Sequence, residues 1–184
     1  MALIIWLITG IILLVGIVFL YYFNRFAVLS NRIDNSLSQI DVQLKRRADL
    51  IPNLIETVKG FAKHEKAAIK TVTEARKALV GAKGVEERVK ADNQLEAALK
   101  TIFAIAENYP DLKANTNFLE LQRELSSTED RVAYARQFYN DSILSYNNLC
   151  LTMPGAFFAK LYKKEEREYL KIADAERKLV KVDF

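Results

Sequence analysis

The feature that most constrains this chain is an uninterrupted apolar run near its beginning. From Ala2 to Phe23 there is no charged residue, and Thr9 and the tyrosine hydroxyls are its only polar side-chain groups. A helix rises about 1.5 Å per residue, so roughly 22 residues reach about 33 Å, enough to cross a hydrocarbon core of about 30 Å. Trp6 near one end and aromatic residues 21–23 at the other fit interfacial belts. We predict a transmembrane anchor at residues 1–24, in contact with the lipid bilayer.

Two other interpretations of the apolar run fit less well. A cleaved signal peptide has a basic region before the run and a small-x-small cleavage site after it. Here no basic side chain precedes the run, and the sequence after it, from Leu20 to Arg25, reads LYYFNR. A buried core helix of this length without a polar face would be unusual in so small a domain.

The distribution of basic residues predicts an orientation. No Lys or Arg lies before the anchor, whereas Arg25 and Arg32 follow it closely. Cytoplasmic flanks of membrane helices are enriched in these residues. We therefore expect a single-pass protein of the bacterial plasma membrane, with a short N-terminus outside and the helical body in the cytoplasm. The one cysteine, Cys150, cannot form an intrachain disulfide, which is compatible with a reducing compartment.

The rest of the chain, residues 25–184, is expected to form one helical domain. Its apolar residues recur in steps of three and four, the period of an amphipathic helix, and no stretch alternates with the period of a strand. Long helices joined by short loops must run antiparallel. The predicted fold is therefore all-α: a transmembrane helix followed by an elongated antiparallel bundle of three long helices plus a shorter C-terminal one. The heptad-like spacing would also support coiled-coil pairing.

Prolines and glycines predict the helix boundaries. Pro52 should kink or divide the first long helix, and the first real stop is expected at Gly81–Gly84. A second helix should cover about 85–108 and end before Pro110. The later boundaries follow the same logic: Thr116 or Asn117 caps a third long helix, which stops before Pro154, and a fourth, charged helix covers about 156–179.

The sequence contains few residues that could act in catalysis or bind a metal. His64 is the only histidine, and no CxxC, HExxH, P-loop or GxGxxG pattern is present. We therefore predict no catalytic residue, no metal and no cofactor, and a protein that is not an enzyme. The alternative is a hydrolase in a cleft between helices, with His64 acting beside a carboxylate.

The formal net charge of +4 does not indicate a nucleic-acid partner, because both signs are interleaved along the chain. The densest basic cluster is Lys45-Arg46-Arg47. A second basic run near the C-terminal end is a candidate membrane-surface contact. This run comprises Lys160, Lys163, Lys164 and Arg167, and it lies beside Phe157, Phe158 and Leu161. The other interpretation is a charged last helix that docks by its apolar side.

Two groups of residues are candidate interaction or structural sites. The first surrounds Pro52 and consists of Arg46, Arg47, Asp49 and Asn53. A proline frees backbone carbonyls, and these side chains could hold the break against a neighbouring helix or contact a partner. Local capping of a broken helix explains them equally well.

The second group is a repeated aromatic-amide pair, Tyr139-Asn140 and Tyr146-Asn147. The pairs are seven residues apart, so both tyrosines project from nearly the same helix face. Buried tyrosines need a partner for the hydroxyl, which an adjacent helix can supply. We interpret the pairs as a packing motif, with an interaction surface as the alternative.

At these residues the chain resembles the LemA family. The stretches that carry the resemblance are 45–54 (KRRADLIPNL), 58–65 (VKGFAKHE), 107–115 (ENYPDLKAN) with Phe118, Leu121 and Gln122, and Ala135-Arg136 with the two Tyr-Asn pairs. The end departs from many members, which finish with a Phe-Pro segment and a Gly-Phe-containing tail, whereas 153–158 here reads MPGAFF. The resemblance implies N-out, single-pass bacterial membrane proteins with an antiparallel helical body and no established enzymatic activity.

These observations lead to one main functional hypothesis and one rival. The main hypothesis is a membrane-anchored structural or scaffolding protein that acts through helix–helix contacts as a homo-oligomer. The rival is an adaptor or sensor for another membrane protein, such as a protease or a signalling kinase. The mass of the protein in mild detergent discriminates between them.

Overall fold

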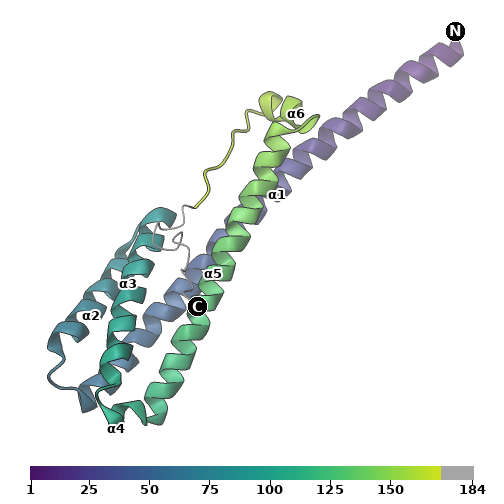
Figure 1. Cartoon of the computed structure of the whole chain (residues 1–184). Helices are drawn as coiled ribbons and strands as arrows, with labels where there is room; N and C mark the ends of the chain where they lie inside the picture. The colour runs from purple at the N-terminus through teal and green to yellow at the C-terminus, as the bar shows by residue number, and fades with distance from the viewer. Residues whose placement is uncertain (171–184) are drawn as a thin grey trace, which may run out of the picture. The chain divides into compact units, whose positions relative to one another are not determined.

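The structure is a computed structural model that describes residues 1–170. The part of the chain that it describes is helical and contains no strand, which confirms the predicted all-α fold (Figure 1). The helices are α1 (Ala2–Phe61), α2 (Lys66–Gly81), α3 (Val85–Ala106), α4 (Pro110–Lys113), α5 (Thr116–Leu151) and α6 (Gly155–Leu161). They form two compact units. The first contains residues 1–36 and 137–169, and the second contains 37–136 and Leu170.

Helix α1 is a single helix of 60 residues that passes through Pro52. Of the two expected outcomes at this proline, a kink or a division of the helix, the division is therefore wrong. The break comes later, where Lys63 and His64 form a turn after Phe61. Consequently the stop at Gly81–Gly84 is real, but it is the second stop of the chain and not the first.

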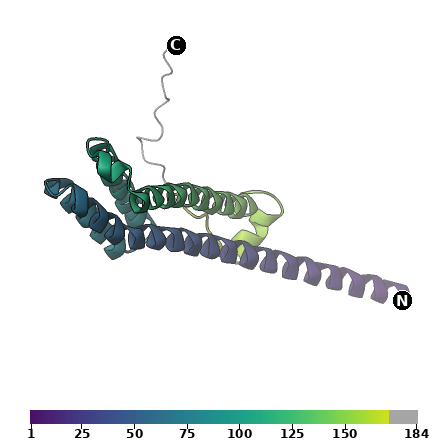
Figure 2. The same cartoon turned by 90° about the horizontal axis from the view of Figure 1, so that it is seen from below.

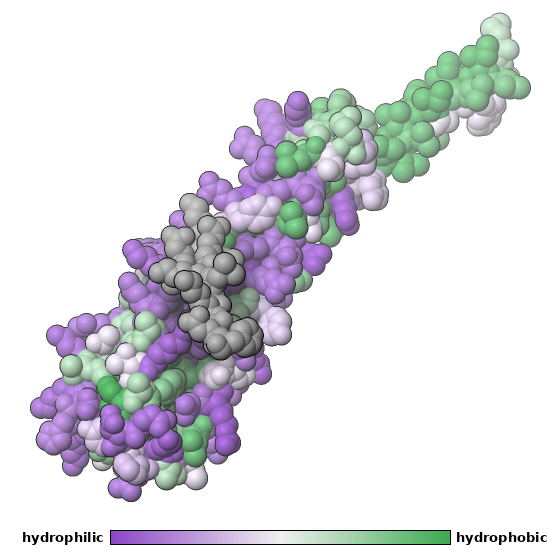
Figure 3. All heavy atoms as spheres, in the orientation of Figure 1, coloured by the Kyte–Doolittle hydropathy of each residue, from purple (hydrophilic) through white to green (hydrophobic). Residues whose placement is uncertain are grey.

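The beginning of α1 has the properties of a membrane span. An 18-residue window of this helix has a mean hydropathy of 3.0, and none of the window is buried. Figure 3 shows this end of the helix as an almost uniformly hydrophobic surface. By length and composition α1 can cross a membrane, so the chain has a candidate N-terminal transmembrane helix, as predicted.

The second unit is a helical bundle with an apolar core. Its members are residues 37–61 of α1, helices α2 and α3, and residues 116–136 of α5 (Figure 2). The short connection between α2 and α3 makes this pair antiparallel, and Gly84 starts α3 with a φ of 94°, which residues with a Cβ rarely adopt. The largest buried apolar side chains of the unit are Ile40, Ile51, Leu54 and Val58 from α1, Val72 from α2, Leu95 from α3, Leu112 from α4, and Phe118 and Leu125 from α5.

The connection between α3 and α5 differs in two details from expectation. The predicted end of the second helix is confirmed, but Pro110 also begins the one-turn helix α4, where its fixed φ suits the first helical position. The cap of α5 is neither Thr116 nor Asn117. Asn115 Oδ1 accepts a hydrogen bond of 3.0 Å from the Phe118 amide, three residues on, so Asn115 is the N-cap.

The first unit joins residues 2–36 of α1 to the end of α5 and to α6. Helix α5 ends at Leu151, before Pro154, as predicted. The predicted fourth helix is wrong over most of its described length, because α6 ends at Leu161 and residues 162–170 are not helical. Residues 171–179 of that prediction lie outside the described residues. A tight approach fixes the start of α6: a Cβ at Gly155 would come within 2.2 Å of the Leu149 carbonyl oxygen.

The cap of α5 can be tested with neighbouring asparagines. Asn115→Ala removes the acceptor for the Phe118 amide and should lower the free energy of unfolding by about 0.5–2 kcal/mol. Asn117→Ala, the matched control, changes an exposed residue inside the first turn and should cost less than about 0.5 kcal/mol. Urea unfolding followed by far-ultraviolet circular dichroism measures both. A larger loss for Asn117→Ala would contradict the assigned cap.

Candidate functional site

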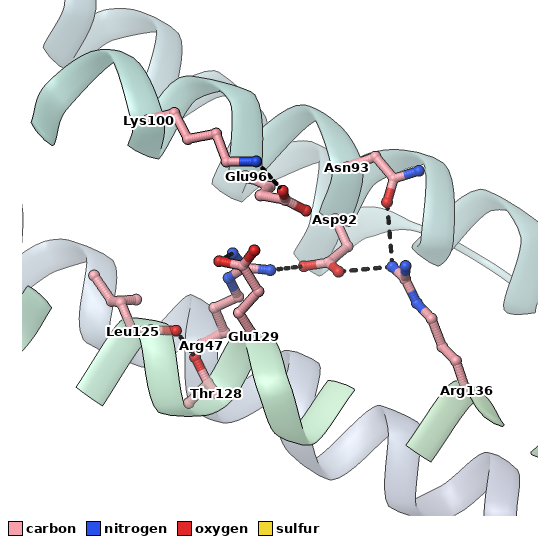
Figure 4. A network of polar contacts seen from close by, with 9 residues as sticks. All are labelled: Arg47, Asp92, Asn93, Glu96, Lys100, Leu125, Thr128, Glu129 and Arg136. Atoms are coloured by element: carbon pink, nitrogen blue, oxygen red, sulfur yellow. Dashed lines mark hydrogen bonds and ion pairs between the residues drawn. The ribbon is translucent and has the colours of Figure 1, made fainter. Parts of the chain in front are cut away.

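The second unit contains a buried ionic network at the centre of its bundle (Figure 4). Arg47 on α1 and Asp92 on α3 are each 1% exposed, and Arg47 Nη1 donates to Asp92 Oδ1 over 2.9 Å. Arg136 on α5 donates to the other carboxylate oxygen over 2.8 Å and also contacts Asn93 Oδ1 at 3.3 Å. One carboxylate therefore holds two arginines, and three helices meet at it.

The positions of these residues follow from helix periodicity. Arg47 lies three residues after Leu44 and four before Ile51, so it occupies the apolar stripe that α1 turns toward the core. Asp92 falls in the same way between Val89 and Leu95 on α3. A charged residue at a core position of an amphipathic helix is therefore the sequence signal for this network. Arg47 was among the predicted residues, whereas Asp92, Arg136 and Glu129 were missed because only apolar positions were followed.

Further charges extend the network toward the surface. Glu129 Oε2 lies 3.4 Å from Arg47 Nη2, and Lys100 forms an i,i+4 ion pair with Glu96. Burial raises the pKa of Glu129, and the neighbouring charge of Glu96 raises it further. Burial also acts to raise the pKa of Glu96, but the hydrogen bond and charge of Lys100 outweigh it, so this pKa lies below its ordinary value.

Burial dominates the electrostatics at the centre. It raises the pKa of Asp92, although the charges of Arg47 and Arg136 act in the opposite direction. Buried ion pairs of this kind often contribute little net stability, whereas the loss of one partner is costly because it leaves the other charge buried and unpaired. The network joins α1, α3 and α5.

A second polar contact accounts for the tolerance of α1 for its proline. Pro52 has no N–H, so the carbonyl of Ala48, four residues earlier, lacks its helical donor. Arg76 on α2 supplies one: its Nε donates to the Ala48 carbonyl oxygen over 2.9 Å. This donor is Arg76 on α2, which was not among the predicted residues.

The other predicted residues near Pro52 are spread over the surface. Arg46 forms an exposed ion pair with Glu124 on α5. Asn53 is exposed, and its carbonyl accepts a hydrogen bond from the Thr57 hydroxyl. Asp49 is also exposed and lines an open cavity of about 400 Å³. The structure therefore separates these side chains and does not assemble them into one site. The cavity is lined by Asp41, Leu44, Lys45, Ala48, Asp49, Arg76, Leu79, Val80 and Arg88.

The Tyr-Asn pairs lie in the first unit and differ in burial. Tyr146 and Asn147 are buried, whereas Tyr139 and Asn140 are half-buried. Asn147 makes two hydrogen bonds of 2.9 Å with the backbone of residue 167: its amide nitrogen donates to the Arg167 carbonyl, and its oxygen accepts from the Arg167 amide. The second pair therefore holds the segment that follows α6 against α5.

The two tyrosines pack as core residues of the first unit. Tyr146 meets Phe26 of α1 edge-on, with 5.9 Å between ring centroids, and Tyr139 packs against the same apolar cluster. Burial raises the pKa of both hydroxyls. The arrangement agrees with a packing motif. Whether the pairs also form an interaction surface stays a prediction.

His64 and Cys150, the two residues considered for catalysis, belong to different units. His64 is exposed in the turn between α1 and α2. Cys150 is half-buried near the end of α5, and burial raises the pKa of its thiol. Among residues 1–170, no three or more His, Cys, Asp or Glu side chains gather where they could hold a metal ion.

Fold and site together define a class: a helical bundle that follows a candidate membrane-spanning helix and is held by internal ion pairs. The sequence model of the LemA family matches residues 36–184 of this chain. The chain belongs to the LemA family.

Three relatives are reported for comparison. Protein LemA of Metamycoplasma hominis is 27% identical over 146 residues, covering 77% of this chain and 66% of that protein. Magnetosome protein MamQ of Magnetospirillum gryphiswaldense and magnetosome protein MamQ 2 of Paramagnetospirillum magneticum are each 24% identical over 173 residues, covering 80% of this chain and 64% of theirs. The chain spans slightly less than two thirds of the length of these relatives. None of the three names denotes an enzyme.

The buried network can be tested by removing its central acceptor. Asp92→Leu leaves Arg47 in the core without its main partner and should lower the free energy of unfolding by about 3–5 kcal/mol. The double variant Arg47→Met/Asp92→Leu removes both buried charges and should recover most of this loss, because Arg136 is 19% exposed and can turn toward water. Denaturant unfolding of the full chain in mild detergent gives both values.

A matched control uses the exposed ion pair of the same bundle. Glu124→Gln breaks the ion pair with Arg46. The Arg46 side chain is 48% exposed and that of Glu124 is 37% exposed, so this change should lower the free energy of unfolding by less than about 1 kcal/mol. Equal losses for Glu124→Gln and Asp92→Leu, or no recovery in the double variant, would contradict the network.

The contact at the proline can be tested with a double-mutant cycle. Arg76→Met leaves the Ala48 carbonyl without its donor and should cost about 1–3 kcal/mol. Pro52→Ala restores a backbone N–H that can bond this carbonyl within α1. In the Pro52→Ala background the Arg76→Met loss should therefore be clearly smaller. Additive losses, measured by denaturant unfolding, would show that the arginine does not replace the missing backbone bond.

Proposed function

We propose that this LemA-family chain is a non-enzymatic structural protein of the bacterial plasma membrane that works by helix–helix self-association. In this proposal residues 1–24 anchor the chain, residues 25–184 form the helical domain, the N-terminus lies outside and the domain lies in the cytoplasm. The chain would act as a homo-oligomeric scaffold and not on a small-molecule substrate.

The observation that carries the proposal is a row of exposed residues on α1. Leu14, Tyr21, Val28 and Asn35 follow one another at intervals of seven; Leu14 and Tyr21 belong to the proposed anchor, and Val28 and Asn35 are exposed on the helix that continues it. An interval of seven keeps residues on one face of a helix and is the spacing of coiled-coil a positions. A single Asn among apolar a positions is a known way to fix the register of such a pairing. We call this row the α1 seam.

The interior of the second unit supports the same conclusion. Its buried charges, Arg47 and Asp92, pair with each other, and the half-buried Arg136 also pairs with Asp92. The cavity of about 400 Å³ is open, and five of its nine lining residues are charged. The bundle is thus built as a stable body, and its exposed faces are the parts available for contacts.

The proposal is tested by the mass of the full chain in mild detergent. Native mass spectrometry or light scattering should find a discrete oligomer. Val28→Glu places a charge at the centre of the α1 seam and should shift the mass to the monomer. Ala27→Glu places the same charge one residue away, at a flanking position where coiled coils commonly carry Glu, and should leave the oligomer intact.

A second candidate function is an adaptor or sensor for another membrane protein. The observation that favours it is Tyr134 on α5, which is 73% exposed in the second unit. Exposed tyrosines are enriched at protein interfaces. A monomeric mass for the unchanged chain would count against self-association and favour this candidate. Crosslinking through Tyr134→Cys in native membranes would then be expected to capture a different protein.

A further inference from the structure

Helix α6 and the residues around it carry an exposed apolar surface that the core of the first unit does not use. Only one face of α6 is buried, through Phe158 and Ala159. The four large apolar side chains that remain exposed are Leu151, Met153, Phe157 and Leu161, with Met153 at 78% and Phe157 at 57%. We call these four residues the α6 tip.

The α6 tip is held beside the end of the candidate membrane span. The Phe158 ring stacks on Tyr22 of α1 with 4.4 Å between centroids and meets Phe19 edge-on at 5.2 Å. The Tyr162 hydroxyl donates to the Phe19 carbonyl oxygen over 2.9 Å. Because all these residues belong to the first unit, α6 lies level with residues 19–23 of α1.

This level corresponds to the boundary between hydrocarbon and headgroups. The apolar run ends at Phe23, and the first charge is Arg25. Phe19 is six residues before Arg25, about 9 Å along the helix. One headgroup layer of a bilayer is roughly 5–8 Å thick. A segment level with residues 19–23 therefore lies at the membrane surface, and not in bulk water, when α1 spans the bilayer.

Basic residues border the α6 tip. Lys160, Lys163 and Lys164 are exposed on α6 and on the turn that ends it. The nearest acidic residues, Glu165 and Glu166, come after this turn, where the chain leads to the Asn147 contact. A cluster of lysines beside exposed apolar side chains is the combination that binds anionic lipid surfaces.

The turn that ends α6 also contains a residue with an unfavourable backbone conformation. Lys163 has a φ of 52°, in the left-handed region. The amide of Lys164 bonds the Ala159 carbonyl and that of Lys163 bonds the Lys160 carbonyl, which is the helix-ending pattern that normally places glycine at this position. A lysine here is unfavourable for the backbone, which is expected where the side chain itself has a role.

We infer that the α6 tip is a second membrane contact, which inserts its apolar side chains at the bilayer surface and binds anionic headgroups through the three lysines. The inference needs α1 to span the bilayer but does not need self-association. The chain would then touch the membrane twice, with the end of α5 brought to the surface by α6.

The test measures the depth of the tip in a bilayer. The full-length double variant Cys150→Ser/Phe157→Cys has its one cysteine at position 157, where it is labelled with a fluorophore. The labelled protein is reconstituted in vesicles of phosphatidylcholine, alone or mixed with phosphatidylglycerol. Bromine atoms on the lipid acyl chains should quench the label, whereas iodide in the aqueous phase should not. The matched control carries the label at Lys77→Cys on α2, an exposed position of the second unit, where the opposite pattern is expected.

The role of the lysines is tested in the same vesicles. Replacing all three of Lys160, Lys163 and Lys164 with Gln should lower the ratio of immersed to free label on the order of 100-fold in the mixed vesicles, since each lysine near an anionic surface contributes about 1 kcal/mol. The inference is overturned if iodide reaches positions 157 and 77 equally. It is also overturned if neither quencher reaches position 157, because protein then covers the tip. Quenching that is independent of phosphatidylglycerol and of the lysines would overturn the anionic contact.

Discussion

The ion pairs of Asp92 with Arg47 and Arg136 are the interaction on which the second unit depends. Each partner comes from a different helix, and Arg47 and Asp92 are removed from water almost completely. An apolar core alone accepts several helix registers of similar energy, because apolar contacts are not directional. A carboxylate that meets two guanidinium groups favours the register of α1, α3 and α5 that brings all three groups together. We expect the network to contribute more to the arrangement of the bundle than to its stability.

The sequence predicted the elements of the fold better than their ends. The long apolar N-terminal helix and the all-helical fold follow from general rules of helix geometry, and these predictions are confirmed. The division at Pro52 failed because the compensation for the missing N–H comes from Arg76, which is distant in sequence. The fourth helix failed because its charges and helical propensity do not reveal that the chain turns after Leu161.

The candidate site could be predicted only in part. Arg47 was identified from its place near Pro52, and its core position could have been inferred from the spacing of Leu44 and Ile51. The partner Asp92 has the same signal on α3, a charge at an apolar position. Which two charges meet depends on how the helices assemble, and that information is not local. The cap of α5 shows the same limit on a smaller scale, since Asn115, Thr116 and Asn117 all have capping side chains and the backbone selects one.

The contact between Asn147 and residue 167 has a consequence for how the sequence of this segment can vary. Asn147 bonds the backbone N–H and C=O of residue 167 and does not recognise its side chain. Position 167 can therefore change type among related proteins without loss of this contact, with proline as the exception because it lacks the N–H. Position 147 needs a side chain with a donor and an acceptor at the length of asparagine. This contact thus places its own sequence requirement on α5, although the Arg167 guanidinium also lies over the Tyr146 ring, 6.0 Å from its centroid.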